Sequence, residues 1–67
     1  MKKPTSRPEW DDFDDRSEFA ADGTVYGKVV PYLQAWQGLF LNDPVGIGAS
    51  REEAKLKVRE AYERWIS

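Results

Sequence analysis

The sequence predicts a small α+β fold, in which an antiparallel β-hairpin or three-stranded sheet packs against one C-terminal amphipathic helix. The observations behind it are a helical apolar stripe near the C-terminus, two β-rich runs in the middle and an acidic N-terminal segment before them. The 67 residues suffice for one domain, and a chain this short buries only about 60% of the surface that its unfolded form exposes. We expect an N-terminal arm over residues 1–22, basic and then acidic-aromatic, and a ββα body over residues 23–67.

The helix is predicted to begin after Ser50, where Ser-Arg-Glu-Glu has the form of a capping box. In such a box the Ser50 hydroxyl accepts a hydrogen bond from the amide of Glu53, and the Glu53 carboxylate accepts one from the amide of Ser50. Apolar residues then recur at helical spacing along about four turns. They are Ala54, Val58, Ala61, Tyr62, Trp65 and Ile66. Leu56 falls on the opposite face, where it is either a candidate contact point for a partner or a second copy of the chain, or an ordinary exposed leucine.

Two strands are predicted over residues 24–33 and 35–41, because both runs are rich in β-branched and aromatic residues. Asp22-Gly23 is a turn signal ahead of the first run. Pro31 lies inside that run and cannot donate a ladder hydrogen bond, which favours an edge position or a bulge. Residues 42–44 should close the second strand. A third short strand would come either from residues 45–48, which otherwise form a glycine-marked connection, or from the N-terminal leader.

The composition argues against catalysis and against a bound cofactor. The chain has no cysteine and no histidine, which removes disulfides, thiolate ligands and the commonest general base near neutral pH. The acidic run also lacks the spacing of a calcium loop, since the third position from Asp11 is Phe13. We therefore expect a protein that is not an enzyme, with no catalytic residue, no cofactor and no metal site.

The charge is nearly balanced overall but unevenly distributed. The formal net charge is -2. Residues 1–8 carry three bases and no acid, residues 9–22 carry seven acids and one base, and residues 23–67 carry six bases and five acids. The balance argues against a general electrostatic attraction to nucleic acid. The chain has neither the long apolar run of a membrane span nor a signal-peptide core, which predicts no membrane partner and a cytoplasmic location.

The acidic-aromatic segment is the strongest candidate for a binding site. Over residues 9–19 we expect a short helix or a series of turns, in which Trp10 and Phe13, three apart, lie on the same side. The rings then either anchor in a partner's groove while carboxylates select a basic rim, or complete the protein's own core. The predicted partner-binding residues are Trp10, Asp11, Asp12, Phe13, Asp14, Asp15, Glu18 and, on the helix, Leu56.

Residues 26–54 resemble the ββα arrangement of the HicB antitoxin family, in which a hairpin precedes a helix that starts with Thr or Ser, Glu, Glu and Ala. The residues that carry the resemblance are the two β-rich runs, the glycines after them and Ser50-Arg51-Glu52-Glu53-Ala54. The resemblance implies a domain that binds a toxin protein. The Pro-Asp-Leu-Pro-Gly type of segment expected after the second strand is absent here. A small acidic chain of this kind also looks like the stand-alone inhibitors that phages and mobile elements encode.

These patterns predict a small non-catalytic protein-binding module that modulates or inhibits a larger protein or protein complex by occluding a basic surface. The alternative is a nucleic-acid-binding or antitoxin-like regulatory module, in which the hairpin and the bases Lys2, Lys3 and Arg7 contact phosphates. Exposed strand edges also offer a route to a homodimer.

Overall fold

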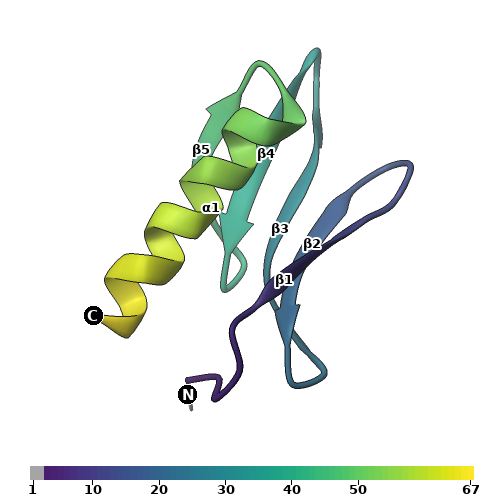
Figure 1. Ribbon diagram of the computed structural model, residues 1–67. Helices are drawn as coiled ribbons and strands as arrows, with labels where there is room; N and C mark the ends of the chain where they lie inside the picture. The colour runs from purple at the N-terminus through teal and green to yellow at the C-terminus, as the bar shows by residue number, and fades with distance from the viewer. Residues whose placement is uncertain (1–2) are drawn as a thin grey trace.

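The computed structural model describes residues 3–67 and shows a five-stranded antiparallel sheet followed by one helix (Figure 1). The strands are β1 (Glu9–Asp12), β2 (Ser17–Ala21), β3 (Thr24–Tyr32), β4 (Ala35–Phe40) and β5 (Asp43–Gly48), and the helix is α1 (Arg51–Ile66). The strands neighbour one another in chain order, so each connection is a hairpin. The α+β prediction is confirmed, and the sheet is larger than the two or three strands expected.

The two additional strands come from the acidic segment, so the expectation of a short helix or turns over residues 9–19 was wrong. Pairing explains the difference, because β2 follows a two-residue periodicity when it lies beside β3: Ser17, Phe19 and Ala21 are buried while the residues between them are partly exposed. The expected boundary between residues 22 and 23 falls in the β2–β3 turn, and both sides of it belong to one sheet. The first two residues of the predicted basic arm lie outside the described residues.

Short turns join the strands. Asp22 and Gly23 both have positive φ angles, of 54° and 77°, as a type I′ hairpin requires, which confirms the predicted turn. Leu41 and Asn42 form the β4–β5 turn with φ angles of 52° and 69°, one residue earlier than the sequence indicated. The following residues, predicted as a connection or a third strand, form β5.

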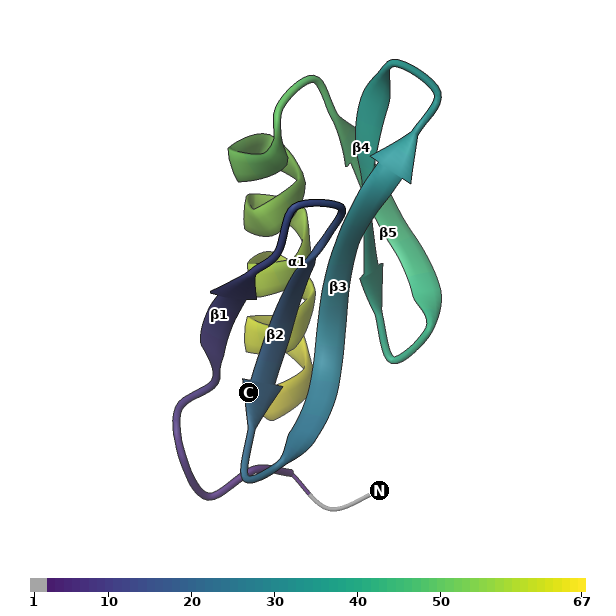
Figure 2. The same ribbon diagram turned by 90° about the vertical axis from the view of Figure 1, so that its right-hand side faces the viewer.

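The helix lies on one face of the sheet, across β3, β4 and β5 (Figures 1 and 2). Glycines let it approach the strands closely. A Cβ atom at Gly27 would collide with Cγ1 of Val58, and one at Gly38 would lie 2.9 Å from both the carbonyl oxygen of Ala54 and Cγ2 of Val58. We call this contact the glycine seat, formed by Gly27 and Gly38 of the sheet under Ala54 and Val58 of the helix, where both helix residues are fully buried.

An aromatic cluster fills the space beside the seat, toward the C-terminal end of the helix. The ring of Phe40 packs edge-on against Tyr62 and Trp65, with centroids 6.4 and 5.5 Å apart. The ring of Phe19 meets Tyr62 edge-on at 5.4 Å, and Tyr26 lies 5.7 Å from Trp65. Such pairs add to the stability gained by burial of the rings. Through Phe19, this cluster joins β2 to the core that the helix covers.

The helix begins as predicted, with one difference in the capping box. The Ser50 hydroxyl accepts a hydrogen bond from the amide of Glu53 at 3.2 Å, as expected. The Glu53 carboxylate accepts its bond from the amide of Ala49, not from that of Ser50. Nowhere in residues 3–67 is there a helix with the length and apolar character needed to cross a bilayer.

Candidate functional site

The predicted site residues other than Leu56 lie on the β1–β2 hairpin, where strand geometry separates them. Trp10 pairs with Phe19 across the two strands and therefore shares the face that the helix covers, whereas Asp11 pairs with Glu18 on the opposite face. Asp12 is again on the helix side, opposite Ser17. The acidic run is therefore divided between two faces of the sheet.

The turn between β1 and β2 carries the most accessible of these groups. We call it the acidic tip, formed by Phe13, Asp14 and Asp15. All three residues are exposed, and Phe13 retains 42% of its accessible surface. Within residues 3–67, the Asp11 and Asp14 carboxylates make no ion pair, so both remain available to a cation from outside.

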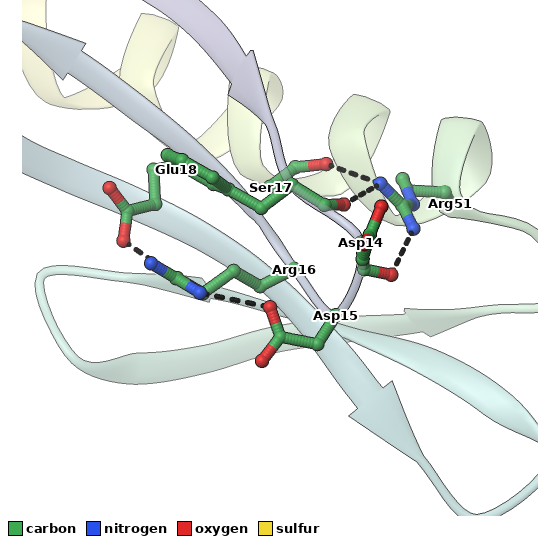
Figure 3. A network of polar contacts seen from close by, with 7 residues as sticks. Asp14, Asp15, Arg16, Ser17, Glu18 and Arg51 are labelled. Atoms are coloured by element: carbon green, nitrogen blue, oxygen red, sulfur yellow. Dashed lines mark hydrogen bonds and ion pairs between the residues drawn. The ribbon is translucent and has the colours of Figure 1, made fainter.

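Arg51, the first residue of α1, holds the tip in place (Figure 3). Its Nη1 donates to the carbonyl oxygen of Phe13 at 2.7 Å, and its Nη2 donates to that of Asp14 at 3.1 Å. The guanidinium also stacks on Trp36 of β4, 4.4 Å from the ring centroid. A charged donor is a strong hydrogen-bonding group, and a planar guanidinium fits two acceptors at once. Arg51 thus ties the tip to the helix and to β4.

Arg16 organises the other side of the tip. Its Nη1 lies 2.9 Å from a carboxylate oxygen of Asp15, and its Nε lies 3.0 Å from one of Glu18 (Figure 3). The same guanidinium lies 4.4 Å from the centroid of the Phe13 ring. These contacts neutralise part of the acidic run and support the Phe13 ring from one side.

Lys55 connects the helix to β1. Its Nζ lies 2.7 Å from a carboxylate oxygen of Asp12 and 5.3 Å from the centroid of the Trp10 ring, and its side chain is only 12% exposed. The hydrogen bond from Lys55, with a second from the Ser17 hydroxyl at 2.7 Å, holds the pKa of Asp12 below its usual value. Trp10 itself packs on Phe19, with ring centroids 4.7 Å apart. Trp10 and Asp12 therefore both make contacts within the molecule, while Trp10 is only partly buried and Asp12 is exposed.

The structure brings together two candidates that lie far apart in the sequence. Trp10 of β1 and Leu56 of α1 line one depression of about 320 Å³, together with Glu52, Lys55 and Arg59. Leu56 is 60% exposed. A second depression of about 380 Å³ also includes Trp10 and Arg59 and extends along the helix toward Ile66. The side of β1 that faces the helix is thus bordered by a shallow, partly apolar groove.

Arg51 and Lys55 were not predicted as parts of the site. The sequence contained a partial signal for Arg51. A cation in the first turn of a helix interacts unfavourably with the helix dipole, so its presence there suggests a role outside the helix. Nothing comparable marked Lys55, because its role depends on the close approach of β1. Within residues 3–67, no three acidic side chains gather closely enough to hold a metal ion.

Comparisons with protein-family models, with curated proteins and with solved structures find no match for this chain. The resemblance to the HicB family stays a prediction.

Proposed function

We propose that this protein is a non-catalytic protein-binding module, which modulates a larger partner by covering a basic surface of it with the acidic tip. The observation that carries the proposal is the Arg51 contact, in which a guanidinium bonds the backbone of the tip and leaves the Asp14 carboxylate without an ion pair among residues 3–67. An arrangement that served only to neutralise the acidic run would pair this cation with a carboxylate.

Preorganisation is the physical reason that this arrangement favours binding. A loop that is already ordered loses less conformational entropy when a partner binds, and more of the contact energy appears as affinity. Aromatic side chains commonly supply much of that energy, while surrounding charges accelerate and select the encounter. The exposed Phe13 ring beside Asp14 and Asp15 has this composition.

Site-directed photo-crosslinking tests the proposal. A photoreactive phenylalanine analogue at position 13 should crosslink to a protein in cells that naturally express the chain. The same analogue at Leu33, which is 91% exposed at the β3–β4 turn, is the matched control and should not crosslink to it. Equal crosslinking from both positions, or none from position 13, would contradict the proposal.

Charge variants make the test specific for the basic surface. Asp14→Asn with Asp15→Asn should reduce crosslinking from position 13, whereas Glu60→Gln with Glu63→Gln, which removes two acids from the exposed side of the helix, should not. The crosslinked partner should be a protein, so nuclease treatment should not remove the crosslinked species. If the captured species is instead nucleic acid, the alternative of a nucleic-acid-binding module replaces this proposal.

A further inference from the structure

β1 is an edge strand of the sheet, and among residues 3–67 no strand pairs with its outer side. Among residues 3–67, β2 is the only strand that pairs with it, and Figure 2 shows β1 at the margin of the sheet, in front of the helix. An edge strand presents free amides and carbonyls to which another extended chain can add. Proteins usually protect such an edge against pairing with other chains.

The two edges of the sheet are protected by different means: β5 obstructs further backbone pairing, whereas β1 is only short and acidic. In β5, Pro44 has no amide hydrogen to donate, the register shifts opposite Gly38 and Leu39, and the side chain of Lys57 lies over Gly46. Proline and irregular register are the usual means by which proteins prevent edge-to-edge pairing. β1 has no proline and pairs with β2 in continuous register. Its backbone is therefore free to accept a strand.

The side chains of β1 specify what that strand must carry. Glu9 and Asp11 lie on the face away from the helix, and Trp10 between them faces the helix and the depression that it shares with Leu56. Directly opposed side chains on neighbouring strands stabilise a sheet when their charges are opposite and destabilise it when they are alike. An added strand should therefore place basic residues opposite Glu9 and Asp11, and an apolar residue opposite Trp10.

The depression supports an apolar residue at the central position. Lys55 is already paired with Asp12 and Glu52, and Arg59 lies 3.7 Å from Glu63, so these cations have partners within the molecule. The exposed Leu56 and the ring of Trp10 remain as apolar surface for a side chain of the added strand.

A second copy of this chain does not fit the edge. Three of the four residues of β1 are acidic. If two copies of β1 paired antiparallel, acids would lie opposite acids whether the symmetry axis passed through a residue or between two residues, and like charges in these positions are destabilising. The edge thus favours a basic strand from a different protein over a homodimer.

We propose that the partner adds an extended strand to β1, with a basic–apolar–basic sequence opposite Asp11, Trp10 and Glu9. This inference rests on the proposed function and assigns it a binding mode. The acidic tip contacts a basic surface beside the strand, and the edge of β1 supplies the backbone hydrogen bonds.

A capped synthetic peptide, Ser-Thr-Lys-Ile-Lys-Thr-Ser, is the probe, titrated into the isotopically labelled full-length protein and followed by NMR. We expect the largest amide shifts at Glu9–Asp12 and at Leu56. A set of peptides is then made, each methylated at one backbone nitrogen. Methylation at every second nitrogen should abolish binding, and methylation at the nitrogens between them should not, because only alternate amides of an added strand point to its neighbour. Uniform effects of methylation, or shifts centred on the tip without β1, would overturn the strand mode.

Protein variants provide a second readout. Glu9→Gln with Asp11→Asn should weaken the peptide about 3- to 10-fold, since two opposed charge pairs are lost. Leu56→Ser should weaken it through the loss of an apolar contact, at a position that is 60% exposed. The matched control is Asp14→Asn with Asp15→Asn, which changes the tip and should leave peptide affinity within about twofold. Equal weakening by the two double variants would show attraction by charge alone and overturn the strand mode.

The two proposals fail separately. Crosslinking from position 13 together with no peptide binding at β1 would preserve the proposed function and refute the added strand. Peptide binding with the alternating methylation pattern, but no crosslinking from position 13, would support the strand and refute the role of the tip.

Discussion

The glycine seat and the β1–β2 hairpin are attached to the same helix by different forces. At the seat, backbone and small side chains pack so closely that a single added carbon finds no room. At the hairpin, Arg51 and Lys55 reach across a wider space, where the groove lies, to backbone carbonyls and a carboxylate. The seat is apolar and fully buried, whereas the hairpin contacts are polar and mostly near the surface.

The comparison predicts that the stability of the fold depends mainly on the glycine seat, whereas the proposed binding depends on the hairpin. Close packing tolerates little change, because an overfilled core must shift its backbone or adopt strained rotamers. Polar contacts near the surface contribute less and are screened by salt. Changes at the hairpin should therefore alter binding while the fold persists, and changes at the seat should do the reverse.

The largest effect is expected for Gly27→Ala. The new methyl group collides with Val58, and we expect a loss of about 1–3 kcal/mol in the free energy of unfolding, measured by urea denaturation. Val58→Ala removes the clashing atom, so the double variant should lose less than the sum of the two single losses. Gly23→Asn is the control, since nothing lies within 4 Å of a Cβ there and asparagine tolerates positive φ. Strict additivity of the first two changes would show that the seat is not tightly packed.

Arg51→Ala should have the next largest effect, about 1–2 kcal/mol, because the backbone of the tip loses a charged donor. The loss of order at the acidic tip should be larger than the loss of stability in the rest of the sheet. Hydrogen exchange at the amide of Phe13, which donates to the carbonyl of Arg16 at 2.7 Å, should accelerate more than exchange in β3 and β4. Arg51→Lys keeps the charge without the bidentate geometry and should give an intermediate rate. Unchanged exchange at Phe13 would mean that the tip is ordered without Arg51.

Leu33→Gly should increase stability by about 0.5–1 kcal/mol in thermal unfolding, because a leucine with a φ of 57° is strained and glycine is not. This turn lies outside both regions compared, so crosslinking from position 13 should not change. Leu41→Gly relieves similar strain but removes a side chain that packs against the core, and should gain less. A larger gain at Leu41 than at Leu33 would contradict this explanation.

The smallest effect concerns pH. The pKa of Asp12 is lowered in the folded state by Lys55 and then by Ser17, so its contribution to stability is present above the unfolded pKa of about 4 and is lost as the pH falls through the folded pKa. Hydrogen bonds from Ser6 and Thr5 also lower the pKa of Asp22. Its contribution to stability is therefore lost in the same direction, as the pH falls. Urea denaturation at a series of acidic pH values should show stability falling below about pH 4, and less steeply for Asp12→Asn.

The partner of Asp12 provides the control for this pH dependence. Lys55→Gln should flatten the acid dependence as well, and the double variant should do little more than Asp12→Asn alone, because both changes remove the same ion pair. An undiminished pH dependence in Asp12→Asn would assign the acid sensitivity to other carboxylates.

Local sequence signals predicted the C-terminal part of the fold well. Ser50 caps the helix, Asp22-Gly23 forms the turn, and residues 24–33 and 35–41 mark β3 and β4 to within one residue. The acidic segment was misassigned because its apolar residues are too few to show an alternating pattern until β3 supplies a neighbour. For Pro31 the sequence indicated an edge position or a bulge. β3 is the central strand and its register with β4 is continuous, but its pairing with β2 ends at Val29, so Pro31 has a paired neighbour on one side only, Trp36 of β4.

The candidate site shows the same division. The sequence alone determined which residue types gather near the N-terminus, namely carboxylates interspersed with aromatic rings, and that a capped amphipathic helix ends the chain. Only the tertiary structure decided that Trp10 lines one depression with Leu56, that Arg51 holds the acidic tip and that β1 forms an open edge. The first two features join residues far apart in the chain, and the third depends on which strands the whole sheet brings together. They therefore depend on the curvature of the sheet and the position of the helix, which no local pattern specifies.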